Sequence, residues 1–150
     1  MGINEFFAGK RIFIDTAPII YFIEDHPTYK NVLKVLMDQV DSGQVILFSS
    51  TLTLIEVLVQ PIRKQRFDLL EKYKQILTHS SSITIYSLDT LIAVKAAEIR
   101  AKYNFKTPDS IQLATSLNFS ADIFLTNDKQ LKINEIPSIT IEELNVMYRQ

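Results

Sequence analysis

The chain has 150 residues, of which 47% are hydrophobic and 22% are charged, as is ordinary for a globular domain with a sizeable core. Sixteen basic and 17 acidic residues leave a formal net charge of -1, so bulk charge does not indicate a nucleic-acid partner. The absence of cysteine excludes disulfides and thiolate metal sites and fits a reducing compartment. Because we find neither a signal peptide nor an apolar run long enough to span a membrane, we expect a cytoplasmic protein with no membrane partner.

The first half of the chain alternates short apolar runs with amphipathic segments. Ile12–Ile14 is a run of β-forming residues, typical of a strand buried on both faces of a parallel sheet. Pro61 should kink or break a long helix that has its N-cap among Ser49, Ser50 and Thr51. The other elements predicted here are helices at Ala17–Glu24 and Tyr29–Asp41, a strand at Val45–Phe48, a helix carrying Leu52 to Val59, and a further helical piece at Phe67–Leu77.

The second half continues the same alternation. Thr107 is the predicted N-cap of a helix with Pro108 at its first position. The other predicted elements are strands at Ile83–Tyr86 and Asp122–Thr126, a helix from Asp89 to about Lys102, and an edge strand at Ile139–Ile141. Strands that alternate with helices predict one α/β domain over residues 1–150. It has three layers (α/β/α) and a mainly parallel central sheet of four to five strands.

Two aspartates follow predicted buried strands. Asp15 ends the run Ile12–Ile14, and Asp128 follows the apolar run Ile123–Leu125. In a parallel sheet both would lie at the carboxyl edge, where open α/β folds bind ligands. Taken singly, each has a local alternative of about equal weight, because Asp is common in turns and at helix starts.

Two further carboxylates are awkward for a purely structural interpretation. Glu56 lies within Leu52–Val59, where nearly every direction around the helix is apolar, so we expect it to be buried. The alternative is a buried ion pair with Arg or Lys. Asp109 falls in the first turn of its helix, where the helix dipole favours a negative charge. The same placement would keep the carboxylate ionised, as a metal ligand must be.

The case for a functional site is stronger when the four carboxylates are considered together. Asp15, Glu56, Asp109 and Asp128 can all face one edge of the sheet. Oxygen-only clusters suit hard divalent cations such as Mg²⁺ or Mn²⁺. Without a cation the four charges would repel one another and raise each other's pKa. A metal-binding site at this edge is therefore the functional hypothesis.

These residues resemble the PIN domain family, and within it the toxin ribonucleases of type II toxin–antitoxin modules. The resemblance covers nearly the whole chain, and its four pieces occur in order. The pieces are Phe13-Ile14-Asp15-Thr16 with Ile19-Ile20-Tyr21, Leu54-Ile55-Glu56-Val57-Leu58, Thr107-Pro108-Asp109-Ser110-Ile111-Gln112-Leu113-Ala114, and Leu125-Thr126-Asn127-Asp128. Two positions depart from the family pattern without touching the acidic residues: Ala17 replaces a common Ser or Asn, and Leu131 replaces a common aromatic residue.

The resemblance implies a Mg²⁺- or Mn²⁺-dependent endoribonuclease that leaves a 5′-phosphate. It implies catalytic roles for Asp15, Glu56, Asp109 and Asp128, of which Asp15, Asp109 and Asp128 would bind metal and Glu56 would orient water or complete the shell of the first ion. Thr16, Thr126 and Asn127 would be supporting polar residues. A homodimer and a small antitoxin protein as partner are implied as well.

Basic residues flank three of the four motifs and are candidates for contacts to RNA phosphates. Any one of them is more simply an ordinary solvated side chain. The candidates are Arg63, Lys64, Arg100, Lys106 and Lys129, with Arg66, Lys102 and Lys132 close by in the sequence.

Two other functions compete with the nuclease. One is a catalytically weak PIN-fold module that works through protein contacts, although the intact set of four acids argues against it. The other is a phosphotransfer protein in which Asp15 accepts a phosphoryl group. Phosphatases of that class carry a second Asp two residues further on, where this chain has Ala17, and receiver domains need an acidic pair that is missing here.

Overall fold

The computed structural model describes residues 2–150. Five strands form one sheet in the order β3-β2-β1-β4-β5, and every pair of neighbours is parallel. The strands are β1 (Lys10–Ile14), β2 (Val45–Ser50), β3 (Thr84–Tyr86), β4 (Ile123–Thr126) and β5 (Ser138–Thr140). The predicted α/β class and parallel sheet are therefore confirmed, and the predicted edge strand lies one residue earlier than expected.

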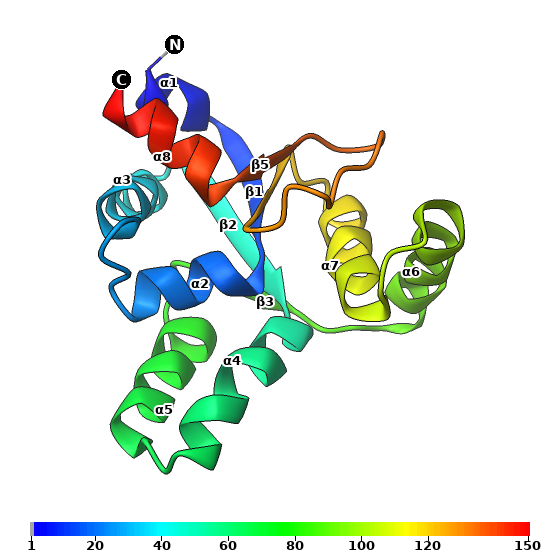
Figure 1. The fold of residues 1–150 in the computed structure, drawn as a ribbon, viewed down its shortest axis with the longest axis horizontal. Coiled ribbons are helices and arrows are strands. Elements are labelled where there is room, and N and C mark those ends of the chain that lie inside the picture. The colour runs from blue at the N-terminus through cyan, green and yellow to red at the C-terminus, as the bar shows by residue number, and fades with distance from the viewer. Residues whose placement is uncertain (1) are drawn as a thin grey trace.

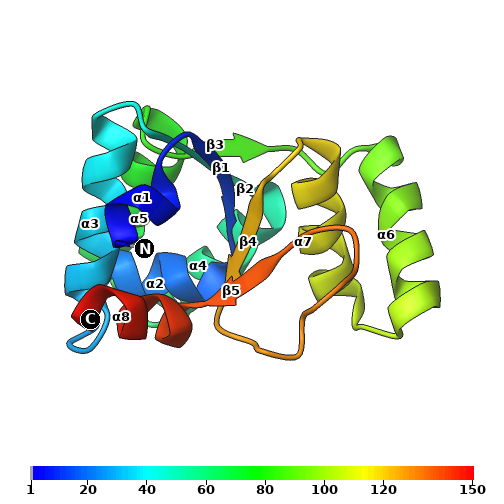
Figure 2. The same cartoon turned by 90° about the horizontal axis from the view of Figure 1, so that it is seen from above.

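Helices cover both faces of this sheet, and Figure 2 shows the strands between the two groups. The helices are α1 (Ile3–Phe7), α2 (Thr16–Ile23), α3 (Lys30–Asp41), α4 (Thr51–Arg63), α5 (Phe67–Lys74), the π-helical segment η1 (Gln75–His79), α6 (Thr90–Tyr103), α7 (Thr107–Asn118) and α8 (Ile141–Arg149). The terminal helices α1 and α8 and the π-helical segment were not predicted. Within residues 2–150, no helix combines the length and the apolar character needed to cross a membrane.

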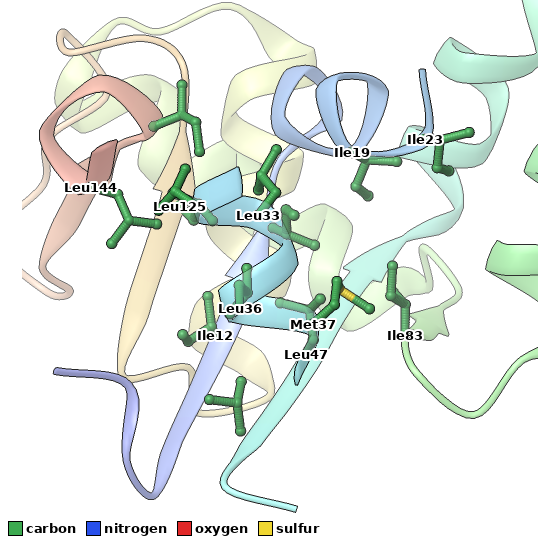
Figure 3. Close-up of a cluster of buried hydrophobic side chains, with 14 of the residues drawn as sticks. Ile12, Ile19, Ile23, Leu33, Leu36, Met37, Leu47, Ile83, Leu125 and Leu144 are labelled. Carbon is green, nitrogen blue, oxygen red and sulfur yellow. The ribbon is translucent and has the colours of Figure 1, made fainter. Parts of the chain in front are cut away.

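The alternation of side chains along β1 builds two separate hydrophobic cores. Ile12 and Ile14 point into the larger core, formed with α1 to α5, η1 and α8 and drawn in Figure 3. Phe13 points into the second core, beneath α6 and α7. There its ring stacks on Phe124 with 5.2 Å between centroids and meets the edge of Phe48 at 5.6 Å. Because β1 is central and covered on both faces, its sequence is continuously apolar.

The predicted break at Pro61 is wrong. The helix α4 continues through Pro61 to Arg63, and Pro61 itself is buried. Proline removes one backbone donor and crowds the preceding turn, but here only two residues of the helix follow it. The chain then turns at Gln65, which has a φ of 53°, and α5 begins at Phe67.

The strand order creates a switch point on one side of β1. The chain passes from β1 outward to β2 and β3, then returns to place β4 on the other side of β1 (Figure 2). Crevices at such reversals, outside the carboxyl ends of the strands, are where open α/β sheets bind ligands. The residues that leave β1 and β4 at this edge are Asp15 and Asn127-Asp128.

Candidate active site

Asp15 lies between the carboxyl ends of β1 and β4 and is the N-cap of α2. Its Oδ1 accepts a hydrogen bond from the Thr16 amide at 2.9 Å, and its Oδ2 accepts one from the Thr126 hydroxyl at 2.9 Å. The Asp15 amide donates to the Leu125 carbonyl at 2.9 Å. Backbone and side chain of Asp15 are thus both fixed to the neighbouring strand, which gives the carboxylate one orientation.

Burial and neighbouring charges raise the pKa of two of the four predicted carboxyls. Burial raises the pKa of Asp15, the hydrogen bonds from Thr16 and Thr126 oppose that rise, and the charges of Asp109 and Glu56 add to it. Burial also raises the pKa of Asp109, and the charges of Asp128 and Glu56 raise it further. The positive charge of Lys106 partly opposes this rise. The hydrogen bonds join Glu56 to Thr16, the residue after Asp15, and bring Gln112, from the helix that carries Asp109, to Asp15.

The predicted burial of Glu56 is wrong, because its side chain is exposed. The outer side of α4 is not covered, as the 62% exposure of the neighbouring Ile55 shows. Glu56 is nevertheless fixed, since its Oε1 accepts a hydrogen bond from the Thr16 hydroxyl at 2.7 Å. No ion pair to Glu56 occurs in residues 2–150, so the alternative of a buried pair with Arg or Lys does not hold either.

Gln112 links three elements beneath the acids, and its role was not predicted. It is 2% exposed, and its Nε2 donates to the Thr53 hydroxyl at 2.7 Å and to Asp15 Oδ1 at 3.4 Å. Its Oε1 accepts from the Ser50 hydroxyl at 2.5 Å, and the Ser49 hydroxyl lies 2.8 Å from that of Thr53. The sequence did hold a signal, because Gln112 interrupts the apolar packing face of α7 one turn after Asp109.

Asp128 and Asn127 lie at the exposed start of the loop between β4 and β5. The Asp128 amide donates to the Thr126 hydroxyl at 3.1 Å, and Asp128 Oδ1 accepts from the Gln130 amide at 2.9 Å. The local turn role considered for Asp128 is therefore real. This turn leaves the other carboxylate oxygen of Asp128, Oδ2, without a hydrogen bond to residues 2–150.

The donor set fits a hydrated hard cation better than an ion enclosed by protein. All the candidate ligands are carboxylate or hydroxyl oxygens, which suit Mg²⁺ and Mn²⁺. Within residues 2–150, no three acidic or imidazole groups converge closely enough to hold one ion. Mg²⁺ typically keeps several waters and takes only one or two carboxylates, so a hydrated ion would need fewer than three of these acids.

The predicted RNA contacts lie in three places. Lys106 is the N-cap of α7 and lowers the pKa of Asp109, while Lys129 follows Asp128, so both lie beside the acids. Arg63 and Lys64 lie at the end of α4. Arg100 differs, because its guanidinium donates to the Phe105 carbonyl at 2.7 Å and so fastens the turn between α6 and α7.

A parallel sheet with a switch point at its central strand places the protein in the class of open α/β domains, which bind ligands at the carboxyl ends of the strands. The PIN domain model matches residues 12–136, and the chain belongs to the PIN domain family. No curated protein matches the chain.

Solved structures share the fold at low identity. The VapBC2 complex of Rickettsia felis, bound to a DNA fragment from its promoter, matches with a TM-score of 0.69 and 17% identity over 87% of this chain and 98% of that one. A toxin–antitoxin complex from Klebsiella pneumoniae matches with a TM-score of 0.64 and 20% identity over 87% and 97%. PAE2754 of Pyrobaculum aerophilum matches with a TM-score of 0.59 and 15% identity over 94% and 98%.

Proposed function

We propose that the chain, as a single PIN domain, is a Mg²⁺- or Mn²⁺-dependent endoribonuclease. The observation that carries the proposal is the position of Asp15, which hydrogen bonds from Thr16 and Thr126 fix at the switch point while the Thr16 hydroxyl binds Glu56. Membership of the PIN family supports hydrolysis of nucleic acid as the reaction class.

Each acid has a distinct role in this proposal. Asp15 and Asp109 are the principal metal ligands, Asp128 holds a second ion or its waters, and Glu56 orients water from the Thr16 side. Thr16 and Thr126 fix the carboxylates, and Asn127 lines the edge beside them. A divalent ion bound here would polarise the scissile phosphate and lower the pKa of an attacking water. Arg63, Lys64, Lys106 and Lys129 contact RNA phosphates on either side.

We further propose that the chain is the toxin of a toxin–antitoxin pair, acting in the cytoplasm as a homodimer. The structural likeness to toxin–antitoxin complexes supports a small antitoxin as partner. Large apolar side chains left exposed on α4 and α5, including Ile55, Ile62 and Phe67, support burial of this surface in an assembly. Light scattering coupled to size exclusion tests the dimer, which a purely monomeric protein would contradict.

The activity is tested by incubating the protein with defined RNAs in Mg²⁺, in Mn²⁺ and in EDTA. We expect cleavage products with 5′-phosphates in either metal and none in EDTA. Asp109→Asn protein, purified in the same way, controls for contaminating nuclease. Cleavage that persists in EDTA, or in the variant, would refute the metal site. Intact RNA under all conditions would instead favour the catalytically weak binding module.

A further inference from the structure

A cleft of about 280 Å³ opens beside the acidic site, between α2, α4 and α5. These three helices lie together in the lower half of Figure 1. Glu56 lines the cleft as well as the acidic edge, so the two spaces share a wall. The other walls are largely apolar and are formed by Ile20, Val57, Pro61 and Leu69. A chain bound across the acids would therefore have a pocket for one of its side groups immediately next to them.

Glu24, an exposed residue on the wall of this cleft, has its carboxylate held by a hydrogen bond. The Tyr73 hydroxyl donates a hydrogen bond to Glu24 Oε2, and both residues line the cleft. Tyr73 is only 1% exposed, and burial together with the Glu24 carboxylate raises the pKa of its phenol well above the usual range. Tyr73 thus remains a donor, and it orients Glu24. A carboxylate has about four acceptor positions, so Glu24 keeps capacity for a ligand with N–H donors.

The rim of the cleft is basic. Lys64 and Arg66 line it from the turn between α4 and α5, and both are exposed. Arg66 forms an ion pair with Asp68, with 3.3 Å between Nε and Oδ1. Lys64 forms no ion pair with any of residues 2–150. Apolar walls, the Glu24 carboxylate as acceptor and the cations of Lys64 and Arg66 match the parts of a nucleotide: the base, its donor edge and its phosphate.

We propose that this cleft is a base-recognition subsite for the RNA nucleotide next to the scissile phosphate, and that it selects guanine. The inference rests on the proposed ribonuclease function. Guanine is the base whose Watson–Crick edge presents two adjacent N–H donors, which a carboxylate accepts in a bidentate manner. Uracil presents one such donor between two carbonyl acceptors, which would face the Glu24 carboxylate unfavourably. Lys64 contacts the phosphate and does not discriminate among bases.

Binding of short RNAs without cleavage tests the subsite. Fluorescence anisotropy at low ionic strength in EDTA compares labelled hexauridine with the same hexamer carrying one guanosine at the third position. We expect the full chain to bind the guanosine hexamer at least about fivefold more tightly, the lower end for a bidentate base contact. Glu24→Gln should abolish the preference and Tyr73→Phe should reduce it. Tyr73→Phe should not change the affinity for hexauridine more than about twofold, whereas Glu24→Gln should leave that affinity unchanged or raise it, because a charge that repels the RNA is removed.

Two controls keep the result interpretable. Glu98→Gln removes an exposed carboxylate from α6, far from the cleft in sequence and element, and should keep the guanosine preference. Lys64→Glu should weaken both hexamers by the same factor. Equal affinity of the wild type for the two RNAs, including no measurable binding of either, would overturn the subsite, as would a preference retained by Glu24→Gln. Cleavage without guanosine preference would refute the subsite alone, and guanosine-dependent binding without cleavage would refute the nuclease alone.

Discussion

The side-chain nitrogen Nε2 of Gln112 donates a hydrogen bond to the hydroxyl of Thr53 at 2.7 Å, and this contact joins α7 to α4 beneath the acidic edge. Asp109 lies one turn before Gln112, and Glu56 lies one turn after Thr53. The same amide reaches Asp15 at 3.4 Å. One buried side chain therefore sets the spacing of helices that carry two of the four acids and contacts a third.

Replacing Gln112 by Leu should destabilise the fold and weaken the site together. The substitution leaves the buried Thr53 and Ser50 hydroxyls short of partners, which costs about 1–3 kcal/mol of unfolding free energy. Loss of the Asp15 contact should lower Mn²⁺ affinity by about 10–100-fold, as is typical for residues that orient metal ligands. Urea denaturation and Mn²⁺ titration measure the two effects. Gln60→Leu, at an exposed position of α4, should change neither, and equal Mn²⁺ affinity in Gln112→Leu would contradict the linking role.

Asp15→Asn should remove cleavage and keep or increase stability in the absence of metal. Burial and the charges of Asp109 and Glu56 raise the pKa of Asp15, so its ionised form opposes folding and a neutral isostere relieves that cost. We expect kcat/KM for RNA to fall at least about a hundredfold, since loss of a ligand should exceed loss of a supporting residue. Asp38→Asn, on the exposed side of α3, is the matched surface control. A strongly destabilised Asp15→Asn protein would contradict the repulsion.

The metal-free protein should lose stability, relative to Asp15→Asn, as pH rises. A carboxyl with a raised pKa in the folded state binds its proton more tightly there than in the unfolded chain. Its stabilising contribution is complete below the ordinary value of 3.8 and is lost as pH passes through the raised pKa. Urea denaturation in EDTA from about pH 3 to about pH 7 measures the difference curve. A wild type that gains stability with pH relative to the variant would reverse the assigned sign.

Lys64 and Arg100 should respond differently to substitution by alanine. Lys64→Ala should lower RNA affinity for all sequences and reduce the slope of log K against log salt by about 0.7, the loss of one phosphate contact on a single strand. Arg100→Ala should instead lower the melting temperature, because it removes the bond to the Phe105 carbonyl. Salt titrations and thermal denaturation of both variants distinguish these roles. An unchanged salt slope in Lys64→Ala would remove Lys64 from the RNA path.

The parts of the site that follow from local sequence were predictable. Ile12–Ile14 and Ile123–Leu125 are apolar runs long enough to mark buried parallel strands, and the residue that ends such a strand lies at the ligand-binding edge. That rule predicted the place of Asp15 directly after β1, and it placed Asp128 in the turn that follows β4.

The parts that depend on packing between distant segments were not predictable. The exposure of Glu56 depends on α4 being uncovered on its outer side, although its sequence is apolar all round. The Gln112–Thr53 contact joins residues 59 positions apart, and no local pattern encodes it. Pro61 stayed helical because the helix ends two residues later, which depends on where α5 packs.

Equilibrium binding of Mn²⁺, followed by electron paramagnetic resonance of the free ion, tests most directly whether these acids form a cation site. The wild type should bind one or two ions, Asp15→Asn and Asp109→Asn should each bind at least about tenfold more weakly, and Asp38→Asn should match the wild type. Mn²⁺ binding that is absent from the wild type, or unchanged in both site variants, would show that Asp15, Glu56, Asp109 and Asp128 do not act together on a metal.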